Sequence, residues 1–120
     1  MSCEVEYTNE FGQWWEKLND TQQVDITTII NLLAAKGTAL PFPYSSGIKN
    51  SKHSHLRELR IQSEGNPLRI FYAFDPRRSA ILLIGGDKTG DNRFYDRFVP
   101  IADRLYDEYI EELRAEGLIP

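Results

Sequence analysis

The sequence predicts an α+β domain whose elements follow the order β-α-α-β-β-β-α, and three observations lead to this fold class. Two amphipathic helical segments follow one another within residues 8–37. A block of strand-forming residues, 56–85, is divided by two tight-turn sequences. A long helical pattern then begins at Asn92. Because short connections make consecutive strands antiparallel neighbours, we expect an antiparallel sheet with the helical hairpin on one face and a C-terminal helix.

The first predicted elements are a short strand and a helix. Residues 4–7 alternate polar and apolar side chains, as expected for a strand at the edge of the sheet. Thr8 or Asn9 is suited to cap the helix that follows. The apolar residues that recur there at helical spacing are Phe11, Trp14, Trp15 and Leu18. They predict one apolar stripe that packs against the sheet.

The second helix is expected to begin at a capping box formed by Asp20 and Gln23. It should end at Lys36-Gly37, because a basic last turn followed by glycine is typical of a helix C-terminus. The two helices form a helical hairpin, since only a tight turn separates them. The prolines and the glycine of residues 38–55 then predict a loop.

Three strands and a final helix complete the predicted order. The strands are expected at residues 56–61, 68–75 and 79–85. The continuous apolar run 80–84 predicts that the last of them is buried on both faces. From Asn92 onward apolar residues recur at helical spacing, and Pro100 is expected to kink this helix or to begin its main segment.

Length and composition fit one domain that spans residues 1–120. The chain is 41% hydrophobic and has two Trp, six Phe and six Tyr to fill a core. Cys3 is the one cysteine in the sequence, so no intrachain disulfide can form, which suits a reducing cytosol. The sequence has no signal-peptide pattern and no apolar stretch long enough for a membrane helix. We therefore expect a cytoplasmic protein with no membrane partner.

The net charge of −4 conceals an uneven distribution of charged residues. Residues 49–93 hold nine basic and five acidic side chains, whereas both flanking segments are acidic. A local positive field attracts a polyanion even when the whole protein is acidic. The alternative interpretation is that these cations only solvate the edges of strands.

The sequence indicates no site for a metal or a nucleotide cofactor. His53 and His55 have no neighbouring cysteine and lack the i, i+4 spacing of helical zinc sites. The segment Gly-Gly-Asp-Lys-Thr-Gly at residues 85–90 lacks the spacing of a phosphate-binding P-loop. We therefore expect no cofactor.

Cations on neighbouring strands form the strongest candidate site. They are Arg57, Arg60, Arg69 and Lys88. Such a cluster can bind a phosphate and stabilise negative charge in a transition state. The alternative is a set of surface ion pairs of little energetic consequence. In that case Arg60 pairs with Glu58 or Glu64, and Arg69 pairs with Asp75.

Three segments carry a resemblance to a known family. They are Leu56-Arg57-Glu58-Leu59-Arg60, Leu68-Arg69-Ile70-Phe71-Tyr72-Ala73-Phe74 and Ile81-Leu82-Leu83-Ile84-Gly85-Gly86-Asp87-Lys88-Thr89-Gly90. In this order, between a helical hairpin and an aromatic-rich helix, they resemble the RelE/HigB family of toxins from bacterial type II toxin–antitoxin modules. The resemblance is greatest to the HigB-like branch and spans nearly the whole chain. It implies a RelE-like fold.

The resemblance also implies an activity, that of a metal-independent endoribonuclease that cuts messenger RNA on the ribosome. The catalytic residues that it implies are Arg60, Arg69, Lys88 and Tyr95. The three cations would hold the phosphate. Tyr95 would stack on a base or donate a proton, unless it is a core aromatic. Candidates for the general base are Asp87, His53 and His55.

The remaining expectations concern RNA, partners and alternatives. Outlying contacts to the RNA backbone are expected from Lys49, Lys52, Arg57, Arg77, Arg78 and Arg93. The resemblance implies a cognate antitoxin with a helix-turn-helix domain. Operator DNA would be contacted only through this antitoxin. The acidic pI of about 5.2 is low for a protein that docks on ribosomal RNA. A ParE-like inhibitor of DNA gyrase, without RNA chemistry, and an inactive phage-derived relative are the alternatives.

Overall fold

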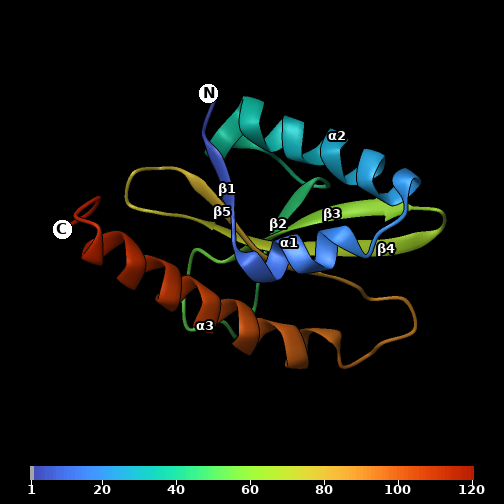
Figure 1. The fold of residues 1–120 in the computed structure, drawn as a ribbon. Helices are drawn as coiled ribbons and strands as arrows, with labels where there is room; N and C mark the ends of the chain where they lie inside the picture. The colour runs from blue at the N-terminus through green and yellow to red at the C-terminus, as the bar shows by residue number, and fades with distance from the viewer. Residues whose placement is uncertain (1) are drawn as a thin grey trace.

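A five-stranded sheet with helices on both faces forms the molecule, as a computed structural model of residues 2–120 shows (Figure 1). The strands are β1 Val5–Tyr7, β2 Ser45–Gly47, β3 Arg57–Ser63, β4 Asn66–Phe74 and β5 Ala80–Asp87. The helices are α1 Asn9–Glu16, α2 Asp20–Lys36 and α3 Phe94–Ala115, with a short 3-10 turn at Gly37–Ala39. The fold class and the order of the main elements are those predicted.

The sheet differs from the prediction in two respects. The spatial order is β1-β5-β4-β3-β2, and β1 pairs with β5 in parallel, so the sheet is mixed rather than antiparallel throughout. The segment 38–55, predicted as a loop, contains β2, which pairs with β3 through Ser45–Gly47. Its sequence, Ser-Ser-Gly, has little intrinsic preference for strand, and pairing with β3 supplies the backbone hydrogen bonds that hold it.

The helix termini follow local capping chemistry. Thr8 caps α1 by accepting a hydrogen bond from the Phe11 amide. The capping box of α2 is formed by Asn19 and Gln22, one residue earlier than the predicted pair. Pro100 lies inside α3 after its first turn, where it removes one helical hydrogen bond without ending the helix.

Two apolar clusters pack on opposite faces of the sheet. The helices α1 and α2 cover one face and α3 covers the other (Figure 1). Alternate residues of β5 belong to different clusters: Ala80 and Leu82 face the helical hairpin, whereas Ile81 and Leu83 face α3. This confirms that β5 is buried on both sides. Within residues 2–120, no helix is long and apolar enough to cross a membrane.

Gly85 and Gly86 lie at the end of β5 and allow both layers to approach it closely. A Cβ atom at Gly85 would collide with the ring of Trp14 on α1. A Cβ atom at Gly86 would lie 2.8 Å from the Phe98 ring on α3. The glycine pair therefore serves close packing of the strand between two helices, and it does not form a phosphate-binding loop.

Candidate active site

The structure brings the four predicted catalytic residues together on the face covered by α3. Arg60 of β3 and Arg69 of β4 are directly opposite one another in the antiparallel ladder. Lys88 follows β5 immediately, and its amide donates a 3.0 Å hydrogen bond to the carbonyl of Pro67. Tyr95 lies in the first turn of α3. Three strands and one helix thus converge at one end of the sheet.

Glu58 is the centre of this cluster, and its carboxylate contacts three of the four residues. Its Oε1 accepts a 2.6 Å hydrogen bond from the Tyr95 hydroxyl and lies 3.6 Å from Nε of Arg69. Its Oε2 lies 3.5 Å from a guanidinium nitrogen of Arg60 and accepts a 2.7 Å hydrogen bond from the Ser46 hydroxyl. Glu58 is only 4% exposed. The Glu58 carboxylate therefore brings Arg60, Arg69 and the Tyr95 hydroxyl together.

Lys88 completes the cluster from the side of Tyr95. Its ammonium lies 3.5 Å from the Tyr95 hydroxyl and 5.2 Å from the centre of the Tyr95 ring. A cation at this distance from an aromatic face is attracted by the ring quadrupole. The Tyr95 ring therefore separates Lys88 from the apolar core while its hydroxyl links Lys88 to Glu58.

The charges in this cluster do not balance. Three cations surround one carboxylate, so the site keeps an excess of positive charge. Arg69 is 5% exposed, and its Nε has no hydrogen-bond partner among the described residues. A buried donor without a partner costs free energy, so the hydrogen bonding of this site is not fully satisfied as it stands. Its excess of positive charge therefore suits the cluster to bind an anion whose oxygens, in planar or tetrahedral arrangement, accept hydrogen bonds.

Local burial and charge shift the pKa values of two site residues. The pKa of Lys88 is lowered, first by burial and then by the positive charge of Arg69, with Arg60 adding to the effect and Glu58 opposing it. The pKa of Tyr95 is raised, first by burial and then by its hydrogen bond to Glu58. Lys88 thus gives up its proton more easily than an ordinary lysine, while Tyr95 keeps its own.

The structure changes the interpretation of the predicted ion pairs. Arg60 does pair with Glu58, as expected if these cations only formed surface ion pairs, but the Glu58 carboxylate is buried within the site rather than exposed. The expected pair of Arg69 with Asp75 is wrong, because Arg69 contacts Glu58 and Asp75 contacts Arg77. Sequence reasoning missed the central role of Glu58. Its position two residues before Arg60, on the same face of a strand, was the available signal.

The outlying cations Arg57 and Lys52 are engaged away from this cluster. Arg57 lies on the other face of the sheet, where its Nε donates a 3.0 Å hydrogen bond to the Ser45 hydroxyl. Lys52 forms an ion pair with Asp107 on α3. Lys49 is exposed in the loop after β2, and Arg93 is exposed just before α3.

Arg77 and Arg78 lie in the turn between β4 and β5, at the end of β4 remote from Arg69. Arg77 pairs there with Asp75 and Glu6. Arg78 is exposed and has a positive φ of 66°. These two residues are therefore at the wrong end of the sheet to contact the same phosphate as Arg69.

The candidate general bases also lie apart from the cluster. The Nε2 atom of His53 is 2.9 Å from a carboxylate oxygen of Asp107, and the rings of His53 and His55 both contact Tyr106. Tyr106 follows Tyr95 on α3 by a helical rise of roughly 16 Å. Asp87 accepts hydrogen bonds from the amide and hydroxyl of Thr89 in the exposed turn after β5. Glu58 is the carboxylate that lies within the cluster itself.

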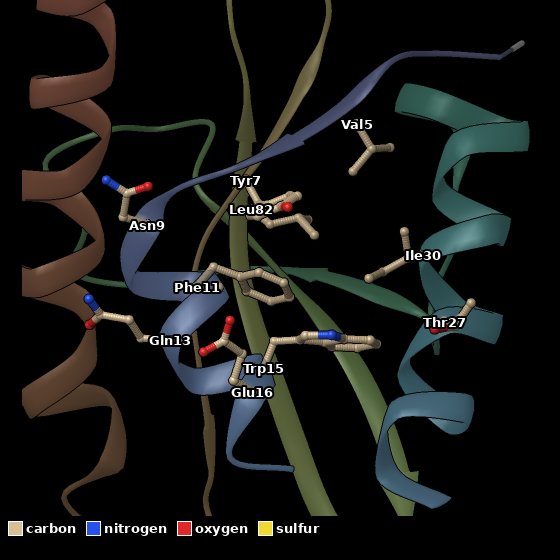
Figure 2. Close-up of a pocket in the computed structure, with 11 residues that line it drawn as sticks. Val5, Tyr7, Asn9, Phe11, Gln13, Trp15, Glu16, Thr27, Ile30 and Leu82 are labelled. Carbon is tan, nitrogen blue, oxygen red and sulfur yellow. The ribbon is translucent and has the colours of Figure 1, made fainter. Parts of the chain in front are cut away.

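A separate apolar groove lies on the opposite face of the sheet, between α1 and α2. It has a volume of about 660 Å³ and is lined mainly by Val5, Tyr7, Phe11, Trp15, Ile30 and Leu82. Figure 2 shows Trp15 and Ile30 directed into the space between the two helices. Tyr7 at its rim is 65% exposed. The groove borders β1, whose outer side is an unpaired edge of the sheet.

Comparison with known proteins gives consistent results for family and fold. Residues 13–107 match the family described as phage derived protein Gp49-like. The chain is 38% identical over 106 residues to the putative toxin HigB3 of Mycobacterium tuberculosis, covering 88% of this chain and 91% of that protein. It is 33% identical over 101 residues to the putative toxin HigB2 of the same organism, covering 82% of this chain but 50% of that protein.

Two solved structures share the fold at low sequence identity. One is the archaeal RelE–RelB complex from Pyrococcus horikoshii, with a TM-score of 0.54 and 13% identity, covering 75% of this chain and 99% of that one. The other is a mutant of the Escherichia coli toxin RelE in the free state, with a TM-score of 0.55 and 10% identity, covering 94% of this chain and 99% of that one. At these identities the comparison concerns the fold alone.

Proposed function

The chain belongs to the Gp49-like family of RelE/HigB-type toxins, and on that premise we propose that it is the toxin of a type II toxin–antitoxin module and cleaves messenger RNA. One observation carries the proposal. Arg60, Arg69 and Lys88 surround the buried Glu58 with more positive than negative charge, on one face of the sheet. A phosphodiester needs such an arrangement, because negative charge builds up on the phosphate during cleavage.

The proposed reaction is attack of a ribose 2′-oxygen on the adjacent phosphorus. The new bond joins O2′ to phosphorus and the bond from phosphorus to O5′ breaks, which leaves a 2′,3′-cyclic phosphate and a 5′-hydroxyl. Arg60 and Arg69 hold the non-bridging oxygens, since guanidinium groups fit phosphate oxygens in pairs. No protein–nucleophile intermediate and no cofactor is needed for this chemistry.

Two protons must move during the reaction. Glu58 takes the proton of the 2′-hydroxyl, because its carboxylate is the basic group at the centre of the cluster. Lys88 gives a proton to the leaving O5′, because burial and Arg69 lower its pKa. Tyr95 donates a hydrogen bond to Glu58 and contacts Lys88, so it orients both groups.

The test is a translation extract to which the purified toxin is added, with new RNA 5′ ends mapped by primer extension. We expect cuts in translated mRNA that end in a 2′,3′-cyclic phosphate and persist in the presence of a chelator for metals other than Mg²⁺. Arg60→Met should lose most of the cutting, because Arg60 is a partly exposed cation of the site. Its matched control, Arg78→Met, removes an exposed cation remote from the site and should cut normally.

Two outcomes would sink this proposal. If wild-type protein produces no new 5′ ends while its expression still arrests growth, a supercoiling assay should be run for the alternative, inhibition of DNA gyrase. If expression neither arrests growth nor cuts RNA, the chain is an inactive relative. The excess of positive charge around Glu58 supports the ribonuclease over both, because neither alternative requires it.

We also propose that an antitoxin covers the groove between α1 and α2. Support comes from the apolar lining of the groove and from the unpaired edge of β1 beside it. An extended segment that pairs with β1 can place an apolar side chain in the groove, as peptides that add a strand to a sheet edge do. Any contact of the module with operator DNA is assigned to the antitoxin, which we propose to be of the helix-turn-helix type.

The antitoxin surface is tested separately from RNA cleavage. We expect Tyr7→Arg to weaken binding of the protein encoded by the adjacent open reading frame by at least tenfold, because Tyr7 lies at the rim of the groove. RNA cleavage by Tyr7→Arg should equal that of wild type, since β5 and β4 separate the edge strand β1 from β3. Unchanged affinity would exclude the groove as the antitoxin site.

A further inference from the structure

An exposed aromatic residue, Phe42, covers one side of Arg60. The guanidinium carbon of Arg60 lies 5.2 Å from the centre of the Phe42 ring. Phe42 is 69% exposed, although phenylalanine is among the residue types most often buried. The contact with Arg60 occupies only part of the ring, and the rest of it is open to solvent.

The backbone fixes Phe42 beside the catalytic cluster. The carbonyl of Pro41 accepts hydrogen bonds from the amides of Tyr44 and Ser45, which closes a tight turn around residues 41–45. The carbonyl of Tyr44 in turn accepts a 2.9 Å hydrogen bond from the amide of Arg60. Leu40, just before the turn, is buried and anchors it. The ring is therefore held next to Arg60 by the chain rather than by its own contacts.

We propose that Phe42 is a stacking platform for a nucleobase of the RNA, next to the phosphate that Arg60 holds. The inference rests on the proposed ribonuclease function and adds a specificity-determining residue to that site. The base that stacks belongs to one of the two nucleotides joined by the cut phosphate. Arg60 thus contacts the backbone and Phe42 contacts the base of the same nucleotide step.

Two physical arguments select a nucleobase as the occupant. Single-stranded RNA is recognised by bases that are splayed out and stacked on aromatic side chains, beside cations that follow the backbone. Phe42 and Arg60 supply both parts within one contact. The ring is also in place before a base binds, because the turn at residues 41–45 fixes its backbone beside Arg60, and this reduces the entropy lost on binding.

The discriminating experiment combines a protein variant with an RNA that lacks one base. Cleavage efficiency, kcat/KM, is measured in the translation extract on an mRNA with all bases. It is measured again on mRNAs with an abasic nucleotide on either side of the cut. Phe42→Ala should lower kcat/KM on the complete mRNA by about 5- to 150-fold, the range expected for loss of one base stack. Phe42→Tyr should retain activity because it retains the ring.

The abasic mRNA shows whether the lost contact is a base contact. At one of the two positions, removal of the base should lower cleavage by the wild-type protein. On that same abasic mRNA, Phe42→Ala should cut as well as wild type, because the contact that the variant lacks is already missing. Tyr7→Ala, which removes a similarly exposed aromatic on β1, is the matched control and should cut both mRNAs as wild type does.

The outcomes separate this inference from the proposed function. If Phe42→Ala cuts as well as wild type, the platform is excluded and the ribonuclease stands. The platform is also excluded if the loss is equally large on all abasic mRNAs, because Phe42 then acts only by positioning Arg60. If wild type cuts no RNA, the proposed function and the platform both fail.

Discussion

Two buried carboxylates, Glu58 and Asp75, lie near opposite ends of α3 and are built from the same kinds of partner. Each accepts a hydrogen bond from a tyrosine of α3: Tyr95 at Glu58 and Tyr109 at Asp75. Each also contacts an arginine on or beside β4. Their charge balance is opposite. Glu58 is alone among three cations, whereas Asp75 shares Arg77 with a second carboxylate, Glu6.

Hydrogen bonding distinguishes the two clusters as well. Asp75 accepts hydrogen bonds from the backbone amides of Arg77 and Ser79 and from the Arg77 side chain, so its oxygens are fully used. The guanidinium groups near Glu58 lie 3.5 and 3.6 Å away and donate no hydrogen bond to it. A cluster whose carboxylate is fully hydrogen-bonded stabilises the fold, whereas one with excess cations is available to an anionic ligand.

The largest expected effect is on catalysis, at Glu58. Glu58→Gln keeps the size of the side chain but removes the proton acceptor, so cleavage should fall by about 10²–10⁴-fold, the usual contribution of a general base. Single-turnover cleavage of a translated mRNA measures it. Glu64→Gln, in the exposed turn between β3 and β4, is the control and should cut normally. A loss smaller than tenfold at Glu58 would remove it from the mechanism.

The next effect is on stability, at Asp75. Asp75→Asn weakens charge-assisted hydrogen bonds to Arg77 and Ser79, so the free energy of unfolding should fall by about 1.5–3 kcal/mol. Urea denaturation measures this change. Cleavage by the folded variant should match wild type within twofold. A variant of normal stability that no longer cuts RNA would invert the roles of the two clusters.

A smaller effect separates the two faces of β5. Gly86→Ala and Gly85→Ala should each lower stability by about 1–3 kcal/mol, because both insert a methyl group against an aromatic ring. Gly86→Ala presses on Phe94 and Phe98, which flank Tyr95, and should also slow cleavage. Gly85→Ala presses on Trp14 on the other face and should not. Thermal unfolding measures the stability of both variants, and a cleavage assay compares their rates. Equal cleavage rates for Gly86→Ala and Gly85→Ala would show that α3 does not position Tyr95 for the reaction.

The smallest effect is the pH dependence of stability at Lys88. Its pKa is lower in the folded than in the unfolded protein, so charged Lys88 opposes folding at neutral pH. As pH rises from the folded pKa towards the ordinary value of 10.5, the unfolded state binds more protons and wild type gains stability. Lys88→Met should therefore be at least as stable as wild type at pH 7.

Denaturation at several pH values measures the difference between Lys88→Met and wild type. The advantage of the variant should shrink as the pH increases through that window. An advantage that grows with pH would mean that the field of Glu58 outweighs those of Arg69 and Arg60. Cleavage by the variant should be lost at every pH, because the proton donor is gone.

The sequence predicted that cations of neighbouring strands gather into one site, and Arg60, Arg69 and Lys88 do so. Alternation along β3 explains the choice of residues, because it puts Arg60 and Glu58 on one face and Arg57 on the other. Strand alternation does not predict that Glu58 is buried, because the burial depends on Tyr95 of α3, 37 residues further along the chain, packing over the sheet. For that reason the pair of Arg60 with Glu58 was interpreted as an exposed one.

The fold was predicted in outline for a similar reason. Long helices and the central strands have periodic apolar patterns, whereas β2 is a strand of three residues that exists through its pairing with β3. The capping box was assigned one residue late because Asn19 with Gln22 and Asp20 with Gln23 have the same spacing. Only the hydrogen bonds distinguish them.

On the proposed function, the cation-rich cluster around Glu58 cuts RNA and the carboxylate-rich cluster around Asp75 does not. The most direct measurement is the cleavage rate of Arg69→Met and of Arg77→Met on the same mRNA in the same extract, with both proteins shown to be folded by circular dichroism. We expect Arg69→Met to lose at least 99% of cleavage, about the effect of losing one donor to the transition state, and Arg77→Met to cut as wild type does. Equal cleavage by the two variants would contradict it.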